Sequence, residues 1–274
     1  MIFSLFLWVV ASTFAQENIT PELEERIHDG AQALKAGELD SAESIFSDAL
    51  RHGIKAPIIY HDLGVIATLR GNHSEAVARF RQSLALQPDF GSSRLLLGSS
   101  LLALRRDSDA VVELKRAAAV LPSEPQVHFE LGRAYERVGN RFGAVQEFQT
   151  LVHLVPQDPE YSYQLGNAWA KLSDWAFRQI IAVNPKSARL PQGLAMEYAE
   201  HGKYDQALSA YRQAAQADPA MPEIHLAMAL ILLNLHRSDE ARAEIENELK
   251  LVPGSKPALA AKEKIVREQG EQSP

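Results

Sequence analysis

The stretch at residues 125–158, PQVHFELGRAYERVGNRFGAVQEFQTLVHLVPQD, holds one full copy of the pattern that decides the fold. It has Leu131 and Gly132 near its start, Gly139 and Asn140 in its middle and Pro156 close to its end. A glycine with a positive φ can end a helix, and a proline disfavours helix at the residue before it. The stretch therefore predicts two helices joined by a short turn, with the second helix ending at the proline.

Small residues are expected where the two helices of this hairpin cross. We expect Gly132 to face Ala144, because two residues without bulky side chains let the helix backbones approach closely. Phe148 and Leu151 then present apolar surface to a following hairpin, since one hairpin cannot bury its own apolar stripe.

The same pattern recurs every 34 residues along the chain. Three residue types keep this step: Gly64, Gly98, Gly132 and Gly166; Ala42, Ala76, Ala110 and Ala144; Pro88, Pro122 and Pro156. The step breaks once, because Pro156 and Pro185 are only 29 residues apart, and it resumes at Pro219 and Pro253. A fixed period of this length is typical of a repeat protein in which each repeat is one supersecondary unit.

These residues resemble the tetratricopeptide repeat, whose signature places an aromatic residue, Leu-Gly, Tyr, Ala, Phe and Pro in a frame of about 34 residues. Residues 57–90 match this signature with Tyr60, Leu63, Gly64, Ala76, Phe80 and Pro88. The resemblance implies an all-α, right-handed solenoid of helix-turn-helix hairpins. Seven repeats are expected within residues 23–255, at 23–56, 57–90, 91–124, 125–158, 159–187, 188–221 and 222–255. The first is a weaker copy, because Ile54 stands where a proline is expected.

The C-terminal end differs from the repeats. Residues 256–270 favour one helix with charged side chains along it. A solenoid needs such a polar helix to cover its last apolar stripe, so we expect a capping helix there. We expect the tail at residues 271–274 to be disordered.

The N-terminal end begins with an apolar run at residues 2–10, followed by the small residues Thr13 and Ala15, which suit cleavage before Gln16. The run is too short to span a bilayer as a helix. We expect a cleaved signal peptide at residues 1–15, a linker at 16–22, and an exported protein without stable membrane insertion, in a bacterial periplasm or secreted. An N-terminal anchor and a misassigned start are the alternatives, because no Lys or Arg precedes the run.

Composition excludes several classes of function. The chain of 274 residues has no cysteine, which excludes disulfides, thiol catalysis and thiolate metal sites. Its formal charge is −7 and its Lys and Arg residues are scattered, so nucleic acid is not an expected partner. The nine histidines are spread singly, and no glycine-rich phosphate loop or two-histidine zinc motif is present. We therefore predict no catalytic residues, no metal site and no cofactor, and hence not an enzyme.

The repeat at residues 159–187 is the short one, and it holds Trp169 and Trp175, the only tryptophans after the predicted cleavage site. Counting back from Pro185 puts Phe177 where a second helix carries its large apolar residue. We expect a shortened second helix at residues 174–183 with Ser173 as its N-cap. The two tryptophans either fill the space left by the missing residues or form an aromatic binding element.

Candidate contacts lie on the first helices, which line the concave groove of such a solenoid. Cationic, amide and aromatic side chains recur at four-residue steps in two neighbouring repeats: Phe129, Arg133 and Arg137; Tyr163, Asn167 and Lys171. They could clamp a carboxylate or the backbone of an extended peptide, while the rings take apolar side chains. This set partly resembles the carboxylate clamp of the family, which we do not assign here. The alternative is a solvated helix face in which Glu136 balances the two arginines.

The sequence thus predicts an exported, non-enzymatic scaffold that binds a protein or peptide in its concave groove. One alternative is a structural component of an envelope complex, self-associating through the apolar inner faces of the repeats at 57–90, 91–124 or 222–255. The other is an accessory module for envelope polysaccharide, with Tyr163, Trp169 and Trp175 stacking on sugar rings.

Overall fold

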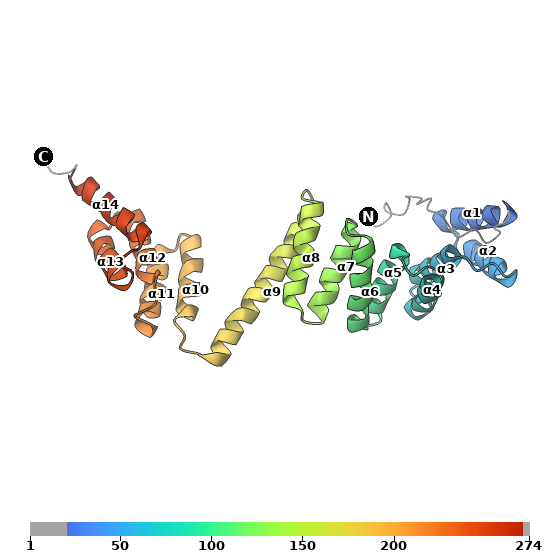
Figure 1. Ribbon diagram of the computed structural model, residues 1–274, viewed down its shortest axis with the longest axis horizontal. Helices are drawn as coiled ribbons and strands as arrows, with labels where there is room; N and C mark the ends of the chain where they lie inside the picture. The colour runs from blue at the N-terminus through green and yellow to red at the C-terminus, as the bar shows by residue number, and fades with distance from the viewer. Residues whose placement is uncertain (1–20, 271–274) are drawn as a thin grey trace. The chain divides into compact units, whose positions relative to one another are not determined.

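The computed structural model describes residues 21–270, which form fourteen α-helices and no strand (Figure 1). The predicted signal peptide, nearly all of the linker and the tail at 271–274 lie outside the described residues. The helices are α1 (Pro21–Lys35), α2 (Leu39–Arg51), α3 (Pro57–Leu69), α4 (His73–Leu86), α5 (Gly91–Ala103), α6 (Asp107–Val120), α7 (Pro125–Arg137), α8 (Arg141–Leu154), α9 (Pro159–Val183), α10 (Arg189–Glu200), α11 (Tyr204–Ala217), α12 (Ile224–Asn234), α13 (Ser238–Leu251) and α14 (Lys256–Gly270). Within this range no helix has the length and apolarity that crossing a membrane requires.

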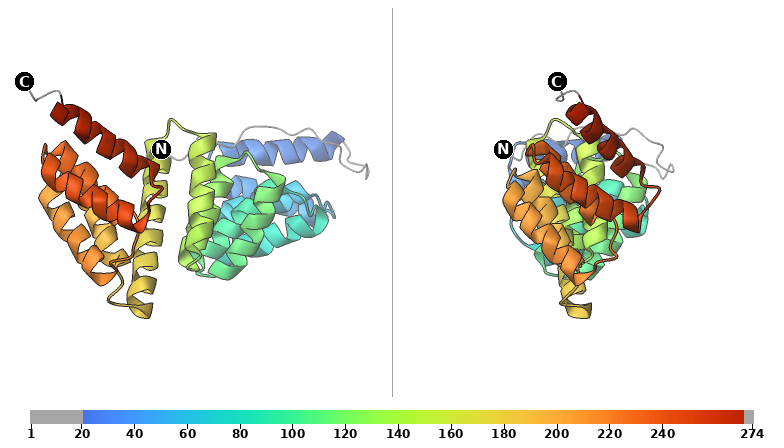
Figure 2. Two further views of the ribbon diagram at one scale, coloured as in Figure 1. Left: turned by 60° about the vertical axis from the view of Figure 1, so that its left-hand side comes forward. Right: turned by 90° about the vertical axis from the view of Figure 1, so that its left-hand side faces the viewer.

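The chain divides into two compact units, and the division falls inside α9, between Trp169 and Ala170. In the first unit, α1 to α8 form four hairpins of consecutive helices; in the second, α10 to α13 form two more, followed by α14 (Figures 1 and 2). The predicted all-α hairpin repeat, with a helix after its last hairpin, is confirmed.

The four hairpins of the first unit share a contact between a glycine on the first helix and a large side chain sixteen residues later on the second. A Cβ added to Gly132 would lie 2.6 Å from Cε1 of Phe148, and one added to Gly64 would lie 2.6 Å from Cε1 of Phe80. Gly30 and Gly98 meet Phe46 and Leu114 in the same way. The atoms nearest to such a Cβ at Gly132 belong to the ring of Phe148, a contact that the expected pairing of Gly132 with Ala144 did not include.

The turns of the hairpins share one left-handed residue. Gly37, Gly71, Gly139 and Gly202 have φ values of 80°, 76°, 78° and 69° just after the first helix of their hairpins. After Gly139, the N–H of Asn140 donates to the carbonyl of Tyr135 at 2.8 Å, which closes α7. Arg105 and His236 hold the same conformation with φ of 60° and 58°, although a side chain makes it less favourable.

The short repeat contains no turn. Ser173 follows Gly139 by one 34-residue step, at the position of the left-handed residue, yet α9 runs unbroken from Pro159 to Val183. The predicted second helix at residues 174–183 with Ser173 as its N-cap is therefore wrong. The spacing of 29 residues between Pro156 and Pro185 leaves too few residues for a turn and a full second helix. A continuous helix keeps the backbone hydrogen bonds that such a turn would break.

The apolar core follows the hairpins, and α9 adds the buried residues Ala168 and Leu172 to it. Most of the buried hydrophobic residues of the described chain belong to three clusters, from α1 to α3, from α3 to α7, and from residue 188 to α14. No residue of α9 belongs to any of them. Trp169 is 52% exposed, so the interpretation that both tryptophans fill a void is wrong for this ring.

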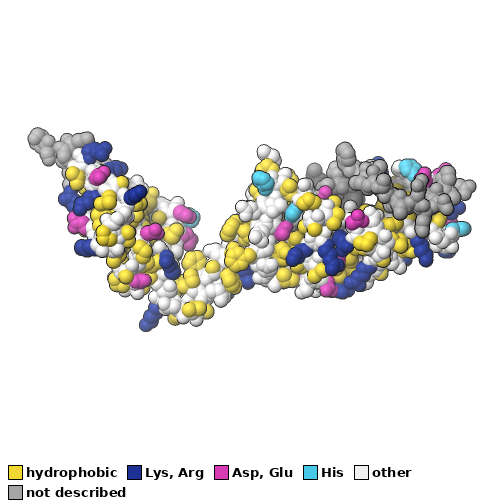
Figure 3. Space-filling view, viewed as in Figure 1, with side chains coloured by type: hydrophobic (Ala, Val, Ile, Leu, Met, Phe, Trp, Pro, Cys, Tyr) yellow, Lys and Arg dark blue, Asp and Glu magenta, His cyan; other side chains and the backbone are white. Residues whose placement is uncertain are grey.

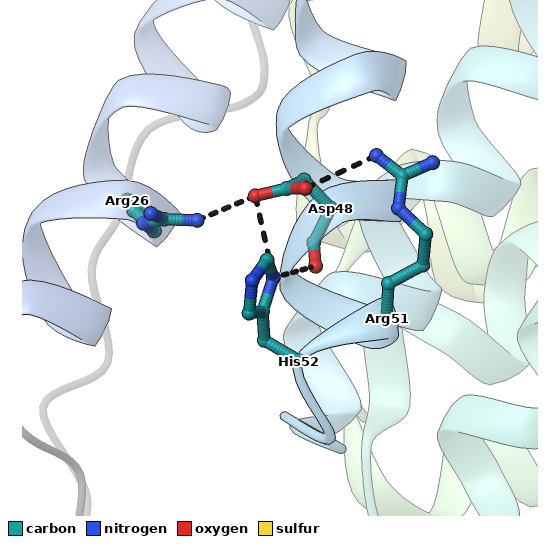
Figure 4. A network of polar contacts seen from close by, with 4 residues as sticks. All are labelled: Arg26, Asp48, Arg51 and His52. Carbon is teal, nitrogen blue, oxygen red and sulfur yellow. Dashed lines mark hydrogen bonds and ion pairs between the residues drawn. The ribbon is translucent and has the colours of Figure 1, made fainter.

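The first hairpin is also tied by charge (Figure 4). Asp48 on α2 accepts from Arg26 on α1 at 2.5 Å and from Arg51 at 3.0 Å, and the ring Nδ1 of His52 lies 3.5 Å from its carboxylate. The hydrogen bond from Arg51, together with His52 and Arg26, holds the pKa of the Asp48 carboxyl below its usual range. These groups are exposed, so the pairs contribute little to stability.

Helix α3 buries two titratable side chains in succession. Nδ1 of His61 lies 2.8 Å from Oγ of Ser93, and the His61 ring stacks on Phe90 at 4.9 Å. Burial lowers the pKa of His61 to about 4. Asp62 is also buried, and burial raises the pKa of its carboxyl to about 7.

The contact between glycine and ring predicts that replacing glycine by alanine has opposite effects on stability at Gly132 and at Gly166. Gly132→Ala should lower the free energy of unfolding by about 1–3 kcal/mol, because its Cβ would press on Phe148. Gly166→Ala should raise it by up to about 1 kcal/mol, because alanine is the better helix former and no atom lies within 4 Å of the added Cβ. Urea unfolding followed by circular dichroism measures both, and equal effects would contradict the proposed role of the ring.

The pKa of Asp62 predicts a pH dependence. The folded state keeps this proton to higher pH than the unfolded state, so stability falls as pH rises from about 4 to about 7. The Asp62→Asn variant should not show this loss. At pH 8 its free energy of unfolding should therefore exceed that of the parent protein by a few kcal/mol, whereas at pH 4 it should not. The measurement is the difference in the free energy of unfolding between the variant and the parent protein across this pH range. The contribution of His61 runs the other way, is lost as pH falls from 6.5 to about 4, and cancels in that difference.

Candidate functional site

The predicted contacts fall on two helices. Phe129, Arg133 and Arg137 lie on α7, while Tyr163, Asn167 and Lys171 lie on α9. Lys171 lies beyond the division between the two units, so the candidate site consists of the five residues of the first unit.

Phe129 forms the aromatic base of the site. Its ring centroid lies 6.5 Å from that of Phe148 on α8 and 6.2 Å from that of Tyr161 on α9. Because it is partly buried between these rings, Phe129 supports its neighbours more than it presents a free surface.

Tyr161 was not among the contacts predicted from the sequence, although its position in the repeat indicates a residue that packs between hairpins. It holds the position occupied by Ile59, Ser93 and Val127 in the three preceding repeats, and all three of those residues are fully buried. A residue at that position is therefore expected to point toward the neighbouring hairpin. Burial raises the pKa of the Tyr161 hydroxyl, with smaller contributions from Asp158 and Glu124.

Arg133 is held in place on two sides. Its Nη1 donates to both carboxylate oxygens of Glu130, at 3.3 and 3.2 Å, and its guanidinium lies 5.6 Å from the centroid of Phe129. Even so, 47% of its side chain is exposed. The guanidinium thus has a fixed position and a solvent-facing part that can still bind an acceptor.

Glu130 is the buried member of this group. Gln126 donates to its Oε1 at 3.1 Å, on the same helix face as the arginine. Burial raises the pKa of the Glu130 carboxyl, and Arg133 opposes that shift. Glu130 holds the position of Asp62 two repeats earlier, so two acids at one position of the repeat are both buried.

Arg137 forms an ion pair with another residue of the chain. Its Nη2 lies 2.7 Å from Oδ1 of Asp107, the first residue of α6, and both side chains are mostly buried. This ion pair ties α7 to the preceding hairpin, so Arg137 contributes to the position of α7 more than to a ligand surface.

Tyr163 and Asn167 are the contacts that α9 offers. Tyr163 is 63% exposed, and Asn167 is partly exposed. The arrangement therefore presents one anchored cation and one open aromatic ring as its accessible features.

The apolar faces that suggested self-association differ from one repeat to another. Leu69 on α3 and Leu230 on α12 are about half exposed, but Leu95 on α5 is buried. Of these three leucines, only Leu69 and Leu230 are exposed to solvent.

Two histidines make polar contacts between the helices of their hairpins. Nδ1 of His128 lies 2.7 Å from Oε2 of Glu147, and its Nε2 lies 2.9 Å from the carbonyl of Pro122. His225 makes the matching contact with Glu244 at 2.7 Å. Residues 21–270 contain no group of three or more His, Asp or Glu side chains placed to hold a metal ion.

Two family models, both described as tetratricopeptide repeat, match the sequence. One matches residues 32–89, 70–126 and 95–159, and the other matches residues 198–265. The stretch between these matches, residues 160–197, contains all of α9 except its first residue. A search of curated proteins found no match.

Solved structures of similar fold are helical repeat proteins. They include a tetratricopeptide repeat protein from Parabacteroides merdae, 17% identical, with a TM-score of 0.49 over 89% of this chain and 98% of that one. The C-terminal part of a repeat protein from Cytophaga hutchinsonii is 17% identical, with a TM-score of 0.49 over 86% and 98%. YrrB, described as a TPR protein with an unusual peptide-binding site, is 16% identical, with a TM-score of 0.42 over 80% and 97%.

The family assignment therefore rests on the sequence models, whose matches together cover more than half of the chain. The chain belongs to the tetratricopeptide repeat family.

Proposed function

We propose that the protein binds a peptide segment of another protein on the groove side of α7 and the first part of α9. Tetratricopeptide repeats generally mediate interactions between proteins, through the surface that their stacked hairpins create. The residues proposed to touch the ligand are Arg133 and Tyr163, with Asn167 beside them and Phe129 beneath.

Arg133 is the observation that carries this proposal. A free arginine loses side-chain entropy when it binds, but this one is already held by Glu130 and by the ring of Phe129. Its exposed part can donate to a carboxylate or a backbone carbonyl of the ligand. Tyr163 offers an amphipathic ring that can cover an apolar side chain of the same segment.

A second arginine provides a matched control. Arg116 on α6 pairs with Glu113 three residues before it at 3.0 Å, as Arg133 pairs with Glu130 at 3.2 Å, and it too is exposed. The two arginines thus make the same kind of ion pair along their helices, but Arg116 lies on the second helix of its hairpin.

The test begins with peptides selected from a displayed random library against the whole protein, whose affinities are then measured by calorimetry. Arg133→Ala should weaken binding by about tenfold or more, because a hydrogen bond from a charged donor is lost. Tyr163→Ala should also weaken it, whereas Arg116→Ala should leave the affinity unchanged.

Peptides that bind all three variants as tightly as the parent protein would show that the ligand surface lies elsewhere. Circular dichroism of each variant, before the titration, confirms that the helices are intact.

A further inference from the structure

Asp62 on α3 is a buried acid to which the described chain gives no partner. The residue is 9% exposed, and burial alone raises the pKa of its carboxyl. No hydrogen bond or ion pair joins this carboxyl to another described residue. Its charged form is therefore costly, because nothing replaces the water that the carboxylate loses on folding.

The other two buried acids of residues 21–270 have partners. Glu130 accepts hydrogen bonds from Gln126 and Arg133. Glu248 accepts from backbone N–H groups at the start of α12. On the surface of the first unit, cationic and acidic side chains lie side by side on the face that Figure 3 shows. The absence of a partner thus distinguishes Asp62 from the other buried acids.

Helix α7 contains the same position of the repeat with its cation in place. Glu130 follows Asp62 by two 34-residue steps, and Arg133, three residues later, pairs with it at 3.2 Å. On α3 the place of this arginine is taken by Val65. Ile58 stands four residues before Asp62, where α7 has a glutamine as the second donor. Helix α3 therefore keeps the buried acid but lacks both donors.

The buried carboxyl of Asp62 lowers the stability of the fold at neutral and alkaline pH, for the reason given for Asp62→Asn above. A side chain that costs stability and has no structural partner is a candidate for binding, because functional sites commonly trade stability for activity.

A cation at the surface can reach a buried acid at this position of the repeat. Arg133 does so on α7, where it pairs with Glu130 although 47% of its own side chain is exposed. The corresponding approach to Asp62 passes over Val65, whose shorter side chain leaves the place of the guanidinium to a ligand.

Asp62 and the peptide site proposed above lie within one unit. Helices α3, α5 and α7 are successive first helices of the first unit, and each contacts the next. Packed helices lie about 8–10 Å apart, so α3 and α7 are about 16–20 Å apart. An extended peptide crosses this distance with about five or six residues.

We propose that Asp62 binds the cationic side chain of a lysine or arginine of the peptide ligand, about five or six residues from the ligand residue that Arg133 binds. This inference rests on the peptide binding proposed above and adds a chemical requirement to it. The ligand supplies to Asp62 the charge that Arg133 supplies to Glu130. The formal charge of −7 also attracts a cationic segment.

Calorimetry at pH 8, where Asp62 is mostly ionised, tests the inference with the peptides selected against the whole protein. These peptides should share a lysine or arginine. Replacing the arginine by citrulline, or the lysine by norleucine, should weaken binding to the parent protein by about tenfold or more, because a charged hydrogen bond is lost. The Asp62→Asn variant should bind the cationic and the neutral peptide equally.

Asp89→Asn is the matched control, because it removes the same charge from an exposed residue in the turn before α5. This variant should keep the full difference in affinity between the cationic and the neutral peptide. Circular dichroism of both variants, before the titration, checks that the helices are intact.

Val65→Arg supplies the missing cation within the chain. The new guanidinium should pair with Asp62 as Arg133 pairs with Glu130. The preference for a cationic peptide should then disappear although Asp62 is unchanged. This variant separates neutralisation of the acid from its removal.

Two results would overturn the inference and leave the peptide site in place. One is a set of peptides that need Arg133 but bind equally well with and without their cation. The other is a cation that contributes as much to binding in Asp62→Asn as in the parent protein. Peptides that bind without Arg133 and Tyr163 would instead remove the proposed function, and this inference with it.

Discussion

The contact between a glycine on one helix and a large side chain sixteen residues later is the interaction on which the four hairpins of the first unit depend. The missing Cβ of Gly132 lets the ring of Phe148 enter, and this sets the distance between α7 and α8. Phe148 in turn packs near Phe129, and Phe129 supports the guanidinium of Arg133. The packing contact between Gly132 and Phe148 thus helps to position the residues of the candidate site. A substitution at this contact would therefore move Phe129 and Arg133, although neither Gly132 nor Phe148 is a proposed ligand contact.

The 34-residue period was sufficient to predict the hairpins, because glycine, alanine and proline each have a physical role at a fixed place in the repeat. It did not identify the partner of Gly132. Ala144 and Phe148 lie one turn apart on the same face of α8 and are both buried, so spacing alone cannot choose between them. The ring is the partner because it is long enough to reach the gap that glycine leaves.

Two other features depend on more than local spacing. Arg105 and His236 turn the chain without glycine, so the side chain at Ser173 did not show whether a turn forms there. The number of residues that follow decides it, and α9 remains one helix. At the site, Glu130 and Glu136 each lie three residues from Arg133, and the sequence could not show that Glu130 binds it. Tyr161 was overlooked because its role depends on contact with the neighbouring hairpin.

The continuous helix α9 also affects how unfolding of one hairpin spreads to the next. In a repeat protein each hairpin is stabilised by its neighbours, so unfolding spreads through shared core residues. The clusters on the two sides of α9 share no residue in the described chain, and α9 itself buries only Ala168 and Leu172. Loss of order in α10 to α14 therefore need not reach α1 to α8. We therefore expect each half to have its own stability, which hydrogen exchange would report as separate free energies of opening.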